Sequence, residues 1–106
     1  MITSYIAPGN PTSDKLTVLK FWANWCAPCK AYKNIVENVA DTMSDVDFCE
    51  VDVDANPALA QANNVTSIPC TVFLYQGHEV GRLTGLVVET TLQDTIQKIK
   101  TQEGLA

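Results

Sequence analysis

The stretch Trp-Cys-Ala-Pro-Cys-Lys at residues 25–30 lies where an apolar segment ends and a helical pattern begins. At a helix N-terminus, unpaired backbone N–H groups and a partial positive charge favour a thiolate over a thiol. Pro28 suits the first helical turn, because its missing N–H has no helical partner there. The motif predicts a redox-active cysteine pair. Cys26 would be the exposed, reactive thiol, and Cys29, one turn into the helix, can close a disulfide with it.

The alternative for these two cysteines is one half of a zinc site. Zinc sites usually combine such a pair with a second Cys-x-x-Cys or with a Cys/His pair, and the sequence has neither. Asp52 and Asp54 share one face of a predicted strand without further convergent ligands, which favours a solvated strand end over a metal site. We therefore expect no bound metal.

The composition is that of an ordinary globular domain. The chain has 106 residues, of which 46% are hydrophobic and 18% charged, so residues 1–106 are expected to form a single domain. The net charge of −5 and the lack of a basic patch argue against a direct nucleic-acid partner. No apolar run is long enough to cross a membrane, and no charged and apolar leader precedes Lys15. A cytoplasmic location, with the remaining cysteines reduced, is the expectation.

Hydrophobic periodicity predicts strands that alternate with helices. The expected strands are residues 2–6, 16–23, 46–53, 71–75 and 79–83. The expected helices are residues 27–43, residues 58–62 after Asn56-Pro57, and a last helix capped by Thr90 or Thr91. The early strand–helix–strand order requires a parallel pair with a right-handed crossover, and the later hairpin adds antiparallel strands. The predicted fold is α/β, with a central mixed sheet and helices on both faces.

Three separated segments, taken together, resemble the thioredoxin family. They are Phe-Trp-Ala-Asn-Trp-Cys-Ala-Pro-Cys-Lys at residues 21–30, Val-Asp-Val-Asp-Ala-Asn-Pro at 51–57, and Val-Thr-Ser-Ile-Pro at 65–69, the last followed by a strand and Gly85. The likeness extends over residues 16–99. It implies the thioredoxin fold and a monomeric protein-disulfide reductase without a bound cofactor. Its partners would be disulfide-containing client proteins and a thioredoxin reductase that supplies electrons.

The resemblance also implies roles for single residues. Cys26 would attack the client disulfide, and Cys29 would resolve the mixed disulfide. Ile68-Pro69 resembles the family's cis peptide bond beside the two sulfurs, and the Ile68 backbone would pair with an extended client segment. The client-docking surface would consist of Trp25, Ala27, Pro28, Ile68, Pro69 and Gly85. Trp22 is expected in the core and Trp25 on the surface.

Two charges depart from the family's pattern. The family's buried acid, six residues before the first cysteine, is Lys20 here, and the partner lysine on the next strand is Glu50. A charge in a central strand is costly unless it is paired, so we expect a Lys20–Glu50 ion pair beneath the disulfide. Our hypothesis is that Glu50 takes the proton from Cys29, through water, while Lys20 favours thiolate formation. The alternative, a purely structural pair, stays open.

Other departures are smaller. Ala27 replaces the family's usual glycine, and Asn34 stands near the place of a helix-kinking proline. Cys70 follows Pro69 where the family commonly has threonine. It is a candidate third redox thiol or modification site, and the alternative is a small buried apolar residue. The N-terminal segment is short, so the family's first strand and helix are expected to be abbreviated or missing.

Two other functions compete with disulfide reduction. Domains of this fold can serve as binding modules, but an intact cysteine pair flanked by Trp25, Pro28 and Pro69 favours the enzyme. The second competitor is an oxidant or isomerase. Pro28 and the absence of a histidine from the loop weigh against it, and a reduction potential would decide.

Overall fold

The computed structural model describes residues 2–7 and 9–105, which build one five-stranded sheet with the order β1-β3-β2-β4-β5. The strands are β1 (Ile2–Ser4), β2 (Leu16–Trp22), β3 (Val46–Asp52), β4 (Cys70–Tyr75) and β5 (His78–Thr84). β3 runs parallel to both β1 and β2, whereas β4 is antiparallel to β2 and β5. The predicted mixed sheet is confirmed.

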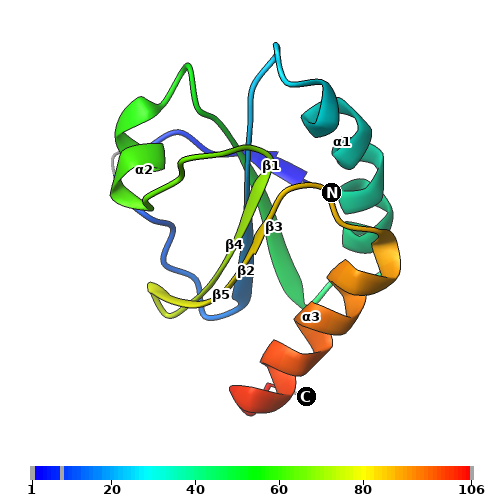
Figure 1. The fold of residues 1–106 in the computed structure, drawn as a ribbon. Coiled ribbons are helices and arrows are strands. Elements are labelled where there is room, and N and C mark those ends of the chain that lie inside the picture. The colour runs from blue at the N-terminus through cyan, green and yellow to red at the C-terminus, as the bar shows by residue number, and fades with distance from the viewer. Residues whose placement is uncertain (1, 8, 106) are drawn as a thin grey trace.

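Helices cover both faces of this sheet, as Figure 1 shows. α1 (Ala27–Ala40) connects the parallel strands β2 and β3 and packs with α3 (Glu89–Gln102) on one face. α2 (Pro57–Ala62) lies on the other face. Successive side chains of β2 point to opposite faces of the sheet, and each face has its own apolar cluster. Val18 packs in the cluster with α1 and α3, and Leu19 packs in the cluster with α2. Because both faces are covered, β2 is buried almost throughout, which explains its nearly continuous apolar sequence.

Two predicted helix ends are wrong. α1 stops at Ala40 rather than at Met43, because the Val39 carbonyl accepts both the backbone N–H and the hydroxyl of Thr42, at 3.1 and 2.8 Å. A continuing α-helix would need that carbonyl for the N–H of Met43, which instead bonds to Ala40 at 3.2 Å. The other strand and helix boundaries agree with the expected ranges within two residues.

The expected cap of the last helix is also wrong. α3 begins at Glu89 with Val88 as the N-cap, and neither Thr90 nor Thr91 caps it. The first α-helical bond joins the N–H of Leu92 to the carbonyl of Val88, at 3.2 Å. The carboxylate of Glu89 in the first turn suits the positive end of the helix, so the start does not need a hydroxyl cap.

The N-terminal part is abbreviated, as expected. β1 has three residues, and no helix precedes β2 among the residues described there, 2–7 and 9–15. Asn56 and Asn63 flank α2 and hold this segment, since their side-chain amides donate to the Ala7 carbonyl at 3.2 Å and to Asn10 at 2.7 Å. In the described part of the chain, no helix has the length and apolar character needed to span a bilayer.

Candidate active site

The two motif cysteines meet at the start of α1. Cys26 is the N-cap, with an extended backbone, and the N–H of Cys29 donates to its sulfur at 3.2 Å. The structure joins Cys26 and Cys29 in a disulfide, with their Cα atoms 5.2 Å apart. This confirms the expected pairing. It also places Cys26 Sγ where a helix N-terminus and a backbone N–H would both stabilise a thiolate.

The expectation that Cys26 is exposed is wrong for the disulfide form. Cys26 is 5% exposed and Cys29 2%. The pair forms a small apolar cluster with Ala23, against which Trp22, Val53 and Ile68 pack. Neighbours from two other loops therefore cover a sulfur that the sequence motif alone places at the surface.

The expected cis peptide bond between Ile68 and Pro69 is confirmed and lies beside the disulfide. The carbonyl oxygen of Ile68 is 3.8 Å from Cys26 Sγ. Gly85 joins this group because its N–H donates to the Pro69 carbonyl at 2.8 Å. Gly85 has a φ of +86°, a conformation that strongly favours glycine. Residues from three separate loops thus meet at the Ile68–Pro69 bond beside Cys26.

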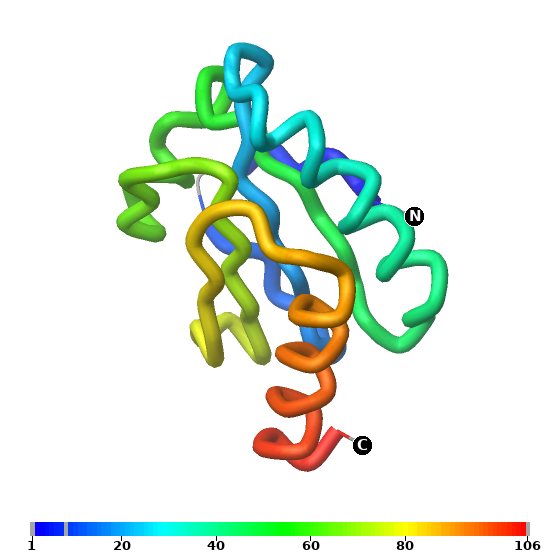
Figure 2. The backbone as a smooth tube through the Cα atoms, turned by 45° about the vertical axis from the view of Figure 1, so that its right-hand side comes forward, coloured from blue at the N-terminus to red at the C-terminus, as the bar shows by residue number. Residues whose placement is uncertain are grey.

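The two tryptophans take different places. Trp25 is 69% exposed, as expected, whereas Trp22 is partly buried against the disulfide. The indole N–H of Trp25 donates to Asp54 at 2.9 Å, an anchor that the sequence reasoning missed. Figure 2 shows the cyan loop before α1 and the green turn after β3 side by side at the top of the molecule, the arrangement that brings these two residues together.

Lys20 and Glu50 form the expected ion pair. They are direct partners in the register of β2 and β3, and Lys20 Nζ lies 3.3 Å from Glu50 Oε2. The Lys20 side chain is 2% exposed and that of Glu50 22%. An almost fully buried ammonium thus has its counter-charge on the adjacent strand, and that counter-charge retains contact with water.

A cavity of about 240 Å³ connects this pair with the redox site. Its lining residues are Lys20, Trp22, Asn24, Cys29, Lys30, Lys33 and Glu50. Cys29 and the buried ion pair therefore face one shared space. That space is large enough for several water molecules, each of which occupies about 30 Å³ in the liquid.

A second buried polar contact, between Tyr32 and Thr71, escaped the sequence reasoning. The Tyr32 hydroxyl pairs with Thr71 Oγ1 at 2.8 Å, and both residues are fully buried. Burial raises the pKa of Tyr32 and so favours its neutral form. Thr71 is also the β4 partner of Lys20, so the polar row Glu50, Lys20, Thr71 and Tyr32 crosses three strands and reaches α1.

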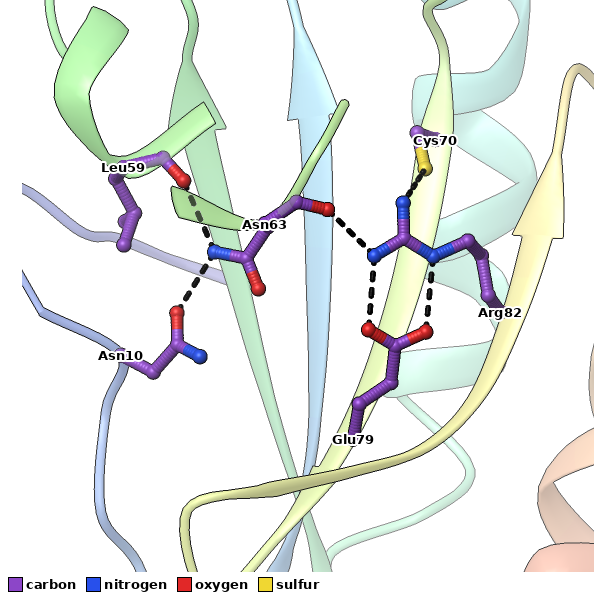
Figure 3. A network of polar contacts seen from close by, with 6 residues as sticks. All are labelled: Asn10, Leu59, Asn63, Cys70, Glu79 and Arg82. Carbon is purple, nitrogen blue, oxygen red and sulfur yellow. Dashed lines mark hydrogen bonds and ion pairs between the residues drawn. The ribbon is translucent and has the colours of Figure 1, made fainter. Parts of the chain in front are cut away.

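Cys70 faces the opposite side of the sheet from that row and is 2% exposed. Its sulfur lies 3.9 Å from an Arg82 nitrogen. Figure 3 shows Arg82 at the centre of this network, where it pairs with Glu79 and donates to the Asn63 carbonyl at 2.6 Å. Burial raises the pKa of the Cys70 thiol, and the nearby Arg82 guanidinium only partly opposes this. These surroundings favour a neutral, packed thiol.

Metal ligands do not gather in the part of the chain that the structure describes. Within it, no three His, Cys, Asp or Glu side chains are placed to hold one ion. Asp52 accepts the N–H of Asp54 at 2.9 Å, and Asp54 accepts Trp25, so the two carboxylates have separate hydrogen-bonding roles at the end of β3. Cys49 is partly buried, and burial raises the pKa of its thiol.

Comparison with known proteins gives a consistent answer. The family profile described as Thioredoxin matches residues 9–98. The chain is 36% identical to Thioredoxin H2 of Arabidopsis thaliana over 83% of its own length and 65% of that protein. It is 36% identical to the thioredoxin of Mycoplasma genitalium over 78% of its own length and 81% of that protein. It therefore spans just under two thirds of the Arabidopsis relative and more of the Mycoplasma one.

Solved structures agree with the sequence comparisons. The X-ray structure of Fasciola hepatica thioredoxin superposes with a TM-score of 0.77 at 40% identity. The match covers 82% of this chain and 83% of that one. The overall arrangement of strands and helices is thus shared with this neighbour.

Proposed function

This chain belongs to the thioredoxin family, and we propose that it reduces disulfide bonds in client proteins through Cys26 and Cys29. The observation that carries the proposal is the disulfide at the start of α1, where the N–H of Cys29 donates to Cys26 Sγ at 3.2 Å. In the reduced protein, the same N–H and the helix terminus would stabilise a Cys26 thiolate. A lowered thiol pKa at a helix start is what a nucleophilic cysteine needs.

The proposed reaction has two exchange steps. The Cys26 thiolate attacks one client sulfur, a bond forms between them, and the other client sulfur leaves as a thiolate. Cys29 then loses its proton and attacks Cys26 Sγ, which displaces the first client sulfur. Two electrons pass to the client, and the protein ends with the Cys26–Cys29 disulfide. A thioredoxin reductase would return two electrons, and no bound cofactor is required.

The docking surface that we propose for clients surrounds Cys26. Trp25, Ala27 and Pro28 are exposed, the Ile68 carbonyl lies 3.8 Å from the sulfur, and Gly85 bonds to the adjoining Pro69. An extended client segment could pair with the Ile68 backbone beside Cys26. Because Cys26 is only 5% exposed, a client must come into close contact with these surrounding residues to reach the sulfur.

We further propose that Glu50 handles the proton released by Cys29. Both residues line the same cavity, so water can bridge them, and Glu50 keeps a 22% exposed side chain through which the proton can reach solvent. Lys20 holds Glu50 in place through the 3.3 Å ion pair and adds positive charge that favours thiolate formation. The proposal requires that Glu50→Gln slow the resolution step and change its pH profile, and an unchanged profile would remove Glu50 from the mechanism.

Single substitutions test the main reaction. A disulfide-bonded peptide with a fluorophore and a quencher reports cleavage by the reduced protein. The wild type and Cys70→Ala are expected to cleave it at similar rates, and Cys26→Ser is expected to be inactive. Cys29→Ser should accumulate a mixed disulfide, detectable by mass. Full activity of Cys26→Ser would refute the proposal. A role in the cell that survives serine at both positions would indicate a binding module instead.

The direction of electron flow needs its own measurement. We expect the Cys26–Cys29 reduction potential to lie near or below the cytosolic glutathione poise, at about −220 mV or lower. Equilibration with glutathione or dithiothreitol, followed by tryptophan fluorescence, measures it. A clearly higher potential would indicate an oxidant or isomerase.

We also propose that residues 1–106 form a single domain and that the protein is a monomer. It would act in the cytoplasm and would not bind nucleic acid.

A further inference from the structure

The segment that carries the cis peptide bond, residues 63–69, has little hydrogen bonding of its own. Among the described residues, the backbone of residues 66–68 forms no hydrogen bond with another backbone group. These residues also line a cavity of about 320 Å³ together with Trp25. The position of the segment beside the redox site therefore depends on what holds its two ends.

Both ends of the segment are held from the β5 side of the sheet. At its start, Arg82 Nη2 donates to the Asn63 carbonyl at 2.6 Å. At its end, the N–H of Gly85, directly after β5, donates to the Pro69 carbonyl at 2.8 Å. Arg82 Nη1 also lies 3.9 Å from the sulfur of Cys70, the residue that follows Pro69. One guanidinium thus contacts the chain at both ends of the segment (Figure 3).

Glu79 fixes the direction in which Arg82 points. Its carboxylate accepts from Arg82 Nε at 2.9 Å and from Nη2 at 2.8 Å, a bidentate pairing that defines the orientation of the guanidinium. Residues three apart in a regular strand point to opposite faces. β5, however, has one extra residue, Val80, opposite the step from Phe73 to Leu74. This bulge lets Glu79 and Arg82 meet on one side of the strand.

We propose that Arg82 is a positioning residue for client binding, because it fixes residues 63–69 and with them the Ile68 backbone beside Cys26. The hydrogen bonds of Arg82 go to groups other than the disulfide, so it acts through the segment. The Ile68 carbonyl lies 3.8 Å from Cys26 Sγ, and a displaced segment would present its backbone to the client at the wrong place. The inference rests on the proposed disulfide reduction, since it concerns the client's pairing with Ile68.

Arg82→Met tests the proposal, because methionine keeps an unbranched side chain and removes every donor. We expect KM for a disulfide-bonded peptide to rise about three- to tenfold, with kcat within about twofold of the wild type. The rate constant for dithiodipyridine, a disulfide too small to pair with the segment, should also stay within about twofold. The control Lys98→Met removes one positive charge from an exposed position on α3 and should leave both reactions unchanged.

A second variant keeps the test valid if Arg82→Met is unfolded at the assay temperature, which thermal unfolding reveals. Glu79→Gln retains the guanidinium but removes the charge that orients it, so KM for the peptide should rise about two- to threefold. The Glu79 side chain is 42% exposed, so this change leaves no buried charge behind. An unchanged KM, equal losses with both substrates, or equal effects of Arg82→Met and Lys98→Met would overturn the proposal.

The mobility of the segment gives a readout that needs no activity. In Arg82→Met, ¹⁵N relaxation of the Thr66, Ser67 and Ile68 amides should report larger motion than in the wild type, because one end of the segment is released. Relaxation identical to the wild type would overturn the proposal. A wild-type protein that leaves the peptide disulfide intact would instead refute the proposed function, and the relaxation measurement would still decide whether Arg82 fixes the segment.

Discussion

Lys20 and Glu50 face each other across the parallel strands β2 and β3, with Nζ and Oε2 3.3 Å apart and the lysine side chain only 2% exposed. This pair stands beneath the redox site, in the same cavity lining as Cys29. Its charges are reversed relative to the thioredoxin pattern, in which an acid stands at the position of Lys20 and a lysine at that of Glu50. The ion pair between the two strands therefore lies in the same cavity wall as Cys29.

Removal of Glu50 should reveal how much free energy it costs to bury the Lys20 ammonium without a counter-charge. Glu50→Gln leaves Lys20 without its counter-charge, and we expect the free energy of unfolding to fall by about 2–3 kcal/mol. This is less than the 3–5 kcal/mol typical of a fully buried pair, because Glu50 is partly exposed. The double variant Lys20→Met/Glu50→Gln should recover most of the loss. Urea denaturation measures both, and wild-type stability of Glu50→Gln would contradict the prediction.

The contact between Tyr32 and Thr71 should behave as a coupled pair. Tyr32→Phe removes the hydroxyl and leaves Thr71 Oγ1 buried without its partner, at a cost of about 1–2 kcal/mol. Thr71→Val should cost a similar amount. The double variant should lose less than the sum of the two, because both polar groups are then gone. Additive losses in the double-mutant cycle would show that the two hydroxyls do not depend on each other.

The buried thiol of Cys70 should make stability depend on alkaline pH. Burial raises the pKa of Cys70 in the folded protein above the ordinary value of 9.0. Above about pH 9 the unfolded chain loses this proton while the folded chain keeps it, so the free energy of unfolding decreases as pH rises. Cys70→Ala should show a shallower decrease between pH 8 and 10 in thermal unfolding. Parallel curves for the variant and the wild type would contradict the assigned environment.

The hydrogen bond from Trp25 to Asp54 should affect client binding more than stability. Trp25 is 69% exposed, and its indole N–H is fixed by Asp54 at 2.9 Å. Asp54→Ala should raise KM for a disulfide peptide about two- to fivefold, because the docking side chain loses its orientation, while the free energy of unfolding changes by less than about 0.5 kcal/mol. Asp54→Asn keeps an acceptor oxygen and serves as the control. A lower kcat with unchanged KM would argue against a docking role.

Much of this protein could be predicted from its sequence, because the signals are local. The apolar run of β2, the helical spacing in α1 and the Pro28 start each involve neighbouring residues whose backbone preferences and periodicity need no distant partner. The Cys26–Cys29 disulfide is equally local, since one helical turn brings the two sulfurs together. The Lys20–Glu50 pair was predictable for a different reason. The family resemblance places opposite charges at these two positions, and a charge in a central strand is costly unless it is paired.

Only the tertiary structure decided which distant groups meet. Three features depend on segments far apart in the chain: the burial of Cys26, the contact of Tyr32 with Thr71, and the position of Cys70 beside Arg82. The sequence motif predicts an exposed Cys26, because it shows where the helix begins but not which distant segments pack against that sulfur. Side-chain packing against other elements determines the exposure of each sulfur, the partner of each hydroxyl and the lining of the cavity.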